Sequence, residues 1–114
     1  MTRARRALGI AGEDLAGAWY ERRGYEVLAR NWRCRRGELD LVLRRGATVV
    51  FCEVKTRSSL AFGSPFDAVT FDKRRRLRSL AAAWLEETGT RAQELRFDVA
   101  GVVEGTVEVI EAAF

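Results

Sequence analysis

Two apolar segments separated by a short polar turn constrain the fold of this chain more than any other feature. Residues 38–43 and 48–55 are rich in Leu, Val and Phe, with polar residues interspersed at the ends, which is typical of β-strands. The four residues between them, Arg44-Arg45-Gly46-Ala47, have the composition of a hairpin turn. The pattern therefore predicts an antiparallel hairpin.

The pairing of this hairpin decides which side chains meet. A two-residue turn at Arg45-Gly46 places Glu38 opposite Glu53 and Asp40 opposite Phe51, and successive residues alternate between the two faces. One face is then almost wholly apolar, and the other is apolar near the turn and charged at its far end. The apolar face comprises Leu39, Leu41, Leu43, Val50, Cys52 and Val54, and the mixed face comprises Glu38, Asp40, Val42, Val49, Phe51, Glu53 and Lys55.

The rest of the chain supplies helices and further strands. Apolar residues at helical spacing predict a first helix over about residues 5–23, and a strand follows over 25–31. Residues 58–66 read as a loop. Ser64-Pro65-Phe66-Asp67 has the form of a capping box for a second helix, which runs to about Thr88 with a break near Thr70. Residues 96–103 and 107–110 read as two final strands. The order α-β-β-β-α-β-β predicts an α/β fold with a mixed sheet flanked by helices, in one domain over 1–114.

Composition excludes several kinds of chemistry. The chain has no histidine, so a histidine general base or a histidine-ligated zinc is excluded. Two cysteines, Cys34 and Cys52, are too few for a disulfide scaffold and fit a reducing compartment. A metal ion here is therefore expected to be a hard cation held by carboxylates. No apolar stretch approaches the length of a membrane span, so we expect a soluble, cytoplasmic protein without a membrane partner.

Positive charge gathers in the first half of the chain. Residues 1–57 carry 13 Arg or Lys side chains against 7 Asp or Glu, whereas residues 58–114 carry 7 against 9. A basic half favours a polyanionic partner, most often nucleic acid, but an arginine-rich proteome produces the same bias. The other basic residues are all arginines, so the two lysines, Lys55 and Lys73, are candidates for a specific role.

The charged end of the hairpin is the strongest candidate for chemistry. Asp40 and Glu53 lie on a diagonal of the mixed face, close enough to share one Mg²⁺, and Lys55 lies two residues beyond Glu53 on the same face. A lysine there can stabilise negative charge on a phosphate. The alternative is a solvated cross-strand salt-bridge patch. A slip of one residue in the hairpin would move Asp40 to the opposite face and remove the site.

The residues at this point resemble a known family. The ordered set is similar to the YraN family and to the PD-(D/E)xK nuclease superfamily, and it covers nearly the whole chain. It comprises Gly9, Gly12-Glu13, Asn31-Trp32-Arg33, Gly37-Glu38-Leu39-Asp40, Glu53-Val54-Lys55-Thr56-Arg57, Phe62-Gly63, Lys73 and Arg96-Phe97-Asp98-Val99.

The resemblance implies a restriction-endonuclease-like core and a Mg²⁺- or Mn²⁺-dependent endonuclease acting on DNA, with branched or damaged DNA as candidate forms. By similarity, Asp40 and Glu53 would be metal ligands and Lys55 the catalytic cation. Glu13 matches an acidic residue that archaeal Holliday-junction resolvases place beside the metal, or it is a helix residue favoured by the helix dipole. Leu39 replaces the proline that usually precedes the aspartate.

Several basic residues are candidates for DNA contacts. They are Arg33, Arg35 and Arg36 in a loop before Asp40, Arg57 after the second strand of the hairpin, and Lys73, which either reaches the site or lies at the edge of the core. The rival hypothesis is a non-catalytic nucleic-acid-binding or protein-interaction module on the same fold. The small size of the chain favours a homodimer as the active form.

Overall fold

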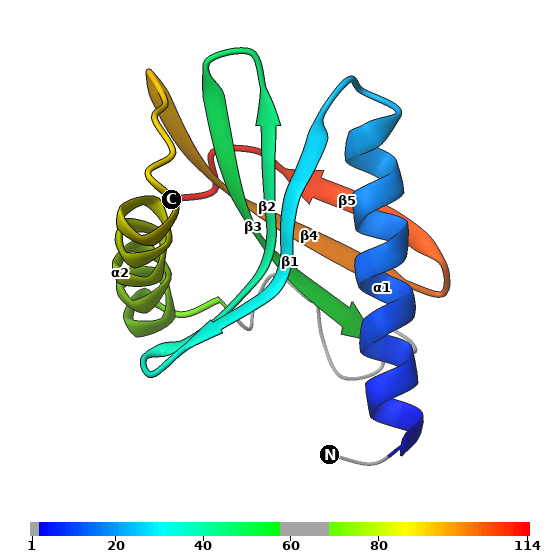
Figure 1. Ribbon diagram of the computed structural model, residues 1–114. Coiled ribbons are helices and arrows are strands. Elements are labelled where there is room, and N and C mark those ends of the chain that lie inside the picture. Colours follow the sequence, from blue (N-terminus) through cyan, green and yellow to red (C-terminus); the bar gives the residue numbers. More distant parts are fainter. Residues whose placement is uncertain (1–2, 58–68) are drawn as a thin grey trace.

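Five strands form one mixed sheet with a helix on each of its faces (Figure 1). The computed structural model describes residues 3–57 and 69–114, without the side chains of residues 4–7. The expected order and the expected α/β class, a mixed sheet flanked by helices, are confirmed. In chain order the elements are α1 (Arg3–Glu21), β1 (Glu26–Cys34), β2 (Gly37–Arg45), β3 (Thr48–Arg57), α2 (Phe71–Thr88), β4 (Glu94–Val103) and β5 (Thr106–Ile110).

The strands lie in the sheet in the same order as in the sequence. β1, β2 and β3 are joined antiparallel, β3 and β4 are parallel, and β5 returns antiparallel to β4. A parallel pair needs a crossover connection, and the segment between β3 and β4 that contains α2 provides it. β3 is therefore the central strand, with the hairpin partner β2 on one side and β4 on the other.

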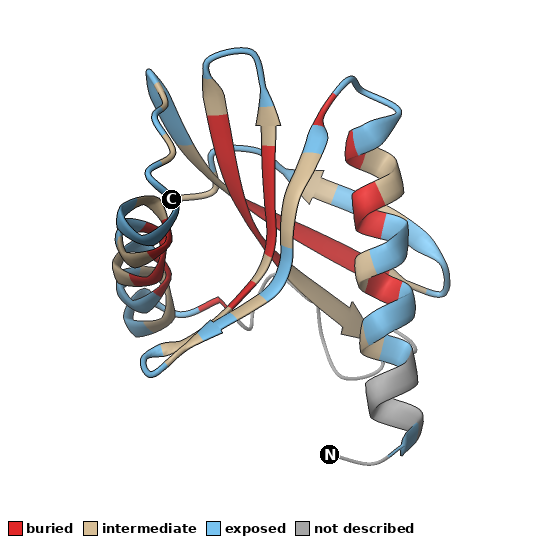
Figure 2. Cartoon of the chain, in the orientation of Figure 1, coloured by how far each residue is buried: buried red, intermediate tan, exposed pale blue. Residues whose placement is uncertain are grey.

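The two faces of the sheet carry two separate hydrophobic clusters. Along β3, Val50 and Cys52 pack with Ala16 and Tyr20 of α1, whereas Phe51 packs with residues of α2 that include Trp84. Buried residues accordingly concentrate in β2, β3, β4 and the sheet-facing sides of both helices (Figure 2). α1 also exposes the large apolar side chains of Leu8, Ile10 and Leu15, and within residues 3–57 and 69–114 no helix is long and apolar enough to span a bilayer.

The pairing expected for the hairpin is wrong by two residues. The turn lies at Gly46-Ala47, so that Arg45 pairs with Thr48 and Val42 pairs with Phe51. Because the pairing is shifted by an even number of residues, most hairpin side chains stay on the face expected for them. Asp40 is consequently not opposite Phe51.

Leu39 is a second correction, since it was expected on the same apolar face as Leu41. Leu39 packs in the cluster under α2, and Leu41 packs in the cluster under α1. The pairing of β2 with β3 ends at Leu41 and Cys52, so β3 no longer imposes the regular alternation on β2 beyond this point.

Two further boundaries differ from expectation. β1 runs to Cys34, so Arg33 lies in a strand and only Arg35 and Arg36 form the turn before β2. α2 begins at Phe71, where Thr70 is the N-cap and its Oγ1 accepts the Lys73 backbone N–H at 3.3 Å. The expected loop over 58–66 and the capping box at 64–67 lie outside the described residues.

Candidate functional site

The site begins where β2 and β3 separate. Their ladder runs from Arg45 opposite Thr48 to Leu41 opposite Cys52, whereas β3 continues beside β4 as far as Arg57. Past this point the β1–β2 hairpin and the end of β3 diverge like the arms of a fork (Figure 1). We call this opening the fork; Asp40 lies at its apex, one residue beyond the last paired position of β2.

Asp40 completes the ladder with its side chain. Its Oδ2 accepts the backbone N–H of Val54 at 2.8 Å, which a carbonyl of β2 would accept if the ladder continued. The carboxylate is thereby fixed between the two arms of the fork. Side chains from both α1 and α2 can reach this position, because β2 and β3 are no longer paired here.

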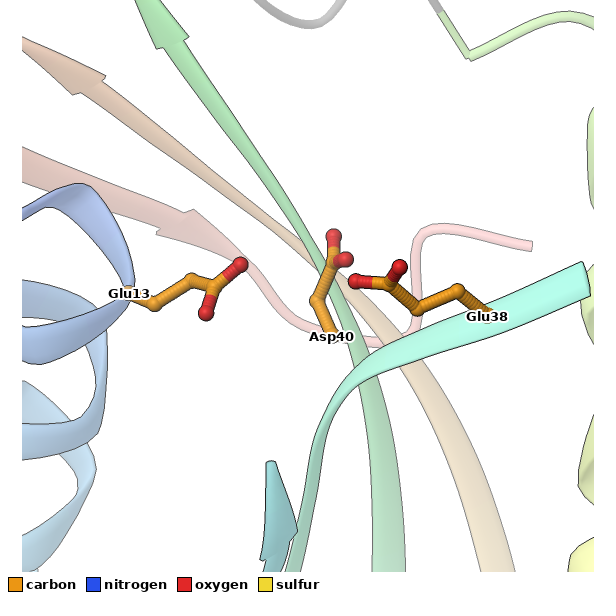
Figure 3. Close-up of side chains that lie close together, drawn as sticks. All are labelled: Glu13, Glu38 and Asp40. Atoms are coloured by element: carbon orange, nitrogen blue, oxygen red, sulfur yellow. The ribbon is translucent and has the colours of Figure 1, made fainter. Parts of the chain in front are cut away.

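Three carboxylates converge at the fork. Glu13 from α1 and Glu38 and Asp40 from β2 have carboxylate oxygens that all lie within 4.8 Å of one another. The three side chains point toward a common space (Figure 3). All three residues are partly buried, so the cluster is held in place and remains open to solvent. Oxygen ligands at this spacing suit a hard divalent cation such as Mg²⁺ or Mn²⁺.

The position of Glu13 depends on a close approach of α1 to the sheet. A methyl group on Gly12 would overlap Thr56 Oγ1, so only glycine allows the helix to lie this near to β3. The Glu13 carboxylate then accepts the Asn31 Nδ2 amide at 2.7 Å. Asn31 has a φ of 50°, a left-handed conformation that asparagine tolerates better than most residues.

Glu53 lies beside this cluster and is engaged by two lysines. Its Oε1 is 3.1 Å from Lys55 Nζ and 3.0 Å from Lys73 Nζ, and the residue is only 7% exposed. A carboxylate buried to this extent needs such partners. Within the described residues no hydrogen bond or ion pair uses its Oε2. Lys73 therefore reaches the site from the first turn of α2. Of its two expected positions, at the site or at the edge of the core, the structure shows the first.

Burial and crowding of like charges shift the pKa values at the fork. Burial, and after it the negative charge of Glu53, raises the pKa of the Asp40 carboxyl to about 7. Burial raises the pKa of Glu13 as well, although the Asn31 hydrogen bond opposes the shift. Burial, and then the neighbouring Lys73, lowers the pKa of Lys55. The Asp40 carboxyl can therefore change its charge near neutral pH when a cation binds.

The remaining basic candidates are distributed around the fork. Arg33 Nε lies 2.9 Å from Glu38, so it is paired with a member of the carboxylate cluster. Arg36 Nη1 donates to Ser79 Oγ at 3.0 Å and joins the β1–β2 turn to α2, while Arg35 is exposed in the same turn. Arg57 is not brought to the cluster: its guanidinium donates to the Thr56 carbonyl, and the residue lines a different pocket, near Gly12.

Sequence reasoning gave too little weight to two residues of the site. Glu38 was expected opposite Glu53 and on the same face as Asp40 but was not included among the expected ligands, whereas its carboxylate lies with those of Glu13 and Asp40. Asn31 was noted only as part of the family pattern. Its isolated position in a strand, where asparagine is uncommon, was the available signal.

A further charged pair lies away from the fork and is structural. Arg96 and Asp98 form an ion pair, with Nε and Oδ1 at 2.9 Å. Asp98 is fully buried and also accepts the Tyr20 hydroxyl at 2.6 Å and the Ala112 N–H at 3.0 Å. This network joins α1, β4 and the segment after β5.

The fold and the fork together define an α/β protein with a carboxylate–lysine cluster where its mixed sheet opens. Residues 12–102 match the family described as "Uncharacterised protein family UPF0102". The chain belongs to this family, which is the YraN family that its motifs resemble. The match covers α1 from Gly12 onward and extends into β4, and so includes every residue of the fork named above.

Relatives from several organisms share most of this chain. A UPF0102 protein of Beutenbergia cavernae is 59% identical over 101 residues, covering 89% of this chain and 86% of the relative. A UPF0102 protein of Nocardia farcinica is 52% identical over 99 residues, covering 87% and 78%. A UPF0102 protein of Acidothermus cellulolyticus is 46% identical over 126 residues, covering 97% and 96%. Their names state family membership and no activity.

Proposed function

We propose that this protein is a Mg²⁺- or Mn²⁺-dependent endonuclease that hydrolyses phosphodiester bonds of DNA. The observation that carries the proposal is the convergence of Glu13, Glu38 and Asp40, with oxygens within 4.8 Å, beside the lysine pair on Glu53. A carboxylate cluster next to ammonium groups combines a cation site with an anion site. Phosphodiester hydrolysis needs both.

The donor set fits a hard cation. The three carboxylates offer only oxygen atoms, and the pKa of Asp40, raised by burial and then by repulsion from Glu53, marks a carboxylate whose charge a divalent cation would stabilise. Glu53, expected as a ligand from the sequence, is not among the three carboxylates within 4.8 Å, and its Oε2 would be a further ligand from beside them. When bound there, Mg²⁺ would supply Lewis-acid polarisation of the phosphate and neutralise part of its charge.

The lysines would act on the substrate. Lys55 is held by Glu53 at the edge of the cluster, where its ammonium group can stabilise negative charge that develops on the phosphate. Lys73 shares the same carboxylate oxygen and would orient the phosphate from the side of α2. Binding of the cation by Glu53 would weaken its hold on both lysines and free them for the substrate.

A panel of labelled DNA substrates tests the proposal. Single-stranded, duplex, flapped and four-way DNA would be incubated with Mn²⁺ or Mg²⁺, with Asp40→Asn beside the parent. Four-way and flapped forms belong in the panel because of the resemblance to junction resolvases. Glu108→Gln, at an exposed position of β5 two strands from Lys55, removes one carboxylate that belongs neither to the cluster nor to the lysine contacts and is the matched control.

We expect the parent and Glu108→Gln to cleave at least one substrate and Asp40→Asn to cleave none. Equal cleavage by parent and Asp40→Asn would mean that the fork is not the active site. DNA binding without any cleavage by the parent would instead favour the non-catalytic nucleic-acid-binding module.

A further inference from the structure

A pocket of about 250 Å³ opens beside the carboxylate cluster, between the start of β2 and the first turns of α2. Its sheet side carries the carboxylates of Glu38, Asp40 and Glu53, and its helix side carries Lys73 and Arg76. We call it the fork pocket. Acidic and basic walls face each other across it, so an occupant must present negative charge to α2 and accept a cation on the sheet side.

The size of the fork pocket limits its occupant. Sites for whole small molecules commonly measure about 300–1,000 Å³ and are lined mainly by apolar groups. The fork pocket is smaller and lined largely by charged groups. These properties suit one segment of a polymer, such as a phosphate with its sugar, better than a free small molecule.

Arg76 is placed on the helix side by its contact with the β1–β2 hairpin. A methyl group on Gly37 would lie 3.8 Å from Arg76 Cδ and 3.4 Å from Leu80 Cδ1, so the aliphatic stem of Arg76 lies close to the glycine backbone. The hairpin itself is joined to α2 by the hydrogen bond from Arg36 to Ser79. This contact places Arg76 in the lining of the fork pocket.

The charge of Arg76 is not used within the described part of the chain. Lys73 is bound to Glu53, and Arg33 to Glu38. Among the described residues, no carboxylate lies within 4.0 Å of the Arg76 guanidinium, and the residue is exposed. A guanidinium can bind a phosphate through two parallel hydrogen bonds, which an ammonium cannot do.

We infer that Arg76 binds a backbone phosphate next to the one that is cleaved and so positions a nucleic-acid strand in the fork pocket. The inference rests on the proposed function for the identity of the strand. Arg76 is a positioning residue in this scheme, since the reacting phosphate lies at the carboxylates and Lys55. Its loss should weaken strand binding and leave the chemical step intact.

Binding without cleavage is the first test. The affinity of Arg76→Ala for a fluorescent single-stranded oligonucleotide would be measured by anisotropy in EDTA over a series of salt concentrations. Arg75→Ala removes the same charge from the adjacent exposed position of α2, which does not line the pocket, and is the matched control. Thermal unfolding of both variants checks that they fold like the parent.

We expect Arg76→Ala to bind about tenfold more weakly and the slope of log K against log salt to shrink by about 0.7, as for the loss of one phosphate contact. Arg76→Lys should recover part of the affinity, and Arg75→Ala should bind like the parent. Equal losses in Arg75→Ala and Arg76→Ala would indicate a general effect of helix charge and overturn the inference. An unchanged affinity of Arg76→Ala would overturn it too.

Steady-state cleavage separates this inference from the proposed function. We expect Arg76→Ala to raise KM about tenfold with kcat within about twofold of the parent. A fall in kcat with unchanged KM would contradict a positioning role. If the parent binds DNA through Arg76 and cleaves no substrate, the proposed nuclease activity is contradicted and Arg76 remains a contact to the strand. If the parent cleaves DNA and Arg76→Ala cleaves it equally well, only the proposed role of Arg76 is contradicted.

Discussion

The Asp40 carboxylate accepts the backbone N–H of Val54 at 2.8 Å, at the point where β2 and β3 separate. One side chain thus ends a β-ladder and supplies a member of the carboxylate cluster. The hydrogen bond fixes the carboxylate, while the divergence of the strands exposes it to Glu13 and Glu38. The residue that ends the pairing of β2 with β3 is therefore also a residue of the site.

Removal of the Asp40 charge should stabilise the metal-free protein at neutral pH. Asparagine keeps an oxygen for the Val54 N–H and removes a negative charge that burial, and after it repulsion by Glu53, disfavours enough to raise the pKa of Asp40 to about 7. Between about pH 4 and 7 the native parent binds more protons at Asp40 than the unfolded chain, so its stability falls as the pH rises through this range. Asp40→Asn lacks this loss and should be more stable than the parent by about 3 kcal/mol at pH 8 in EDTA.

Urea unfolding of both proteins at pH 4, 6 and 8 in EDTA measures this difference. The two curves should converge toward pH 4, where the parent carboxyl is protonated in both states. Asp40→Ala is the control, because it removes the hydrogen-bond acceptor as well as the charge and should give a smaller gain or a loss at pH 8. A constant offset between parent and Asp40→Asn at every pH would contradict a raised pKa.

The affinity for a cation should rise with pH, whereas the stability of the metal-free protein falls. A cation at the fork needs Asp40 ionised, so protons compete with it below the pKa of about 7. The dissociation constant for Mn²⁺ should rise by about tenfold for each pH unit below 6 and level off above 8. Calorimetric titrations in buffers of different ionisation enthalpy should detect release of nearly one proton at pH 6. An affinity that is flat between pH 5 and 8 would exclude Asp40 from the cation site.

Much of the fold could be predicted from the sequence because its strands are strongly patterned. The alternation over residues 38–43 and 48–55 identifies both hairpin strands and most of their faces, and those faces survive a pairing error of two residues. The turn was misplaced because Arg45-Gly46 and Gly46-Ala47 both satisfy a two-residue loop.

The site was less predictable, because its parts come from distant segments. Asp40, Glu53 and Lys55 share one hairpin and could be grouped by spacing alone. Glu38 shares a face with Asp40 by the same spacing, whereas Glu13 joins the cluster from α1, and no local pattern marks that approach. The approach of Arg76 to Gly37 is a tertiary contact between α2 and a strand turn, and helical periodicity describes Arg76 simply as a charged outer position.

Gly12→Ala should separate Glu13 from the other two carboxylates. The added methyl group overlaps Thr56 Oγ1, so α1 must shift away from the end of β3 at a cost of about 1–3 kcal/mol. Mn²⁺ affinity should fall together with the free energy of unfolding. Gly17→Ala is the matched control, since a methyl group there meets no atom within 4 Å of the described structure and should stabilise the helix by about 0.5–1 kcal/mol. Unchanged Mn²⁺ binding by Gly12→Ala would mean that Glu13 is not a ligand.

Asp98→Asn should destabilise the fold without changing the cation site. The carboxylate accepts hydrogen bonds from Arg96, from the Ala112 N–H and from the Tyr20 hydroxyl, whose pKa burial raises, so that this hydroxyl stays protonated and donates. An asparagine amide has a single oxygen and would leave at least one of these buried donors without an acceptor.

The expected loss is about 3–5 kcal/mol of unfolding free energy, as for breaking a buried charged pair. Asp14→Asn makes the same chemical change in an ion pair with Arg30 whose side chains are 60% and 41% exposed, and it should cost less than about 1 kcal/mol. Urea unfolding compares the two variants. Mn²⁺ titration of Asp98→Asn under conditions where it is fully folded should return the parent affinity, because the Asp98 network and the fork share no side chain. A weakened Mn²⁺ affinity in that folded variant would mean that the network on β4 also sets the geometry of the fork.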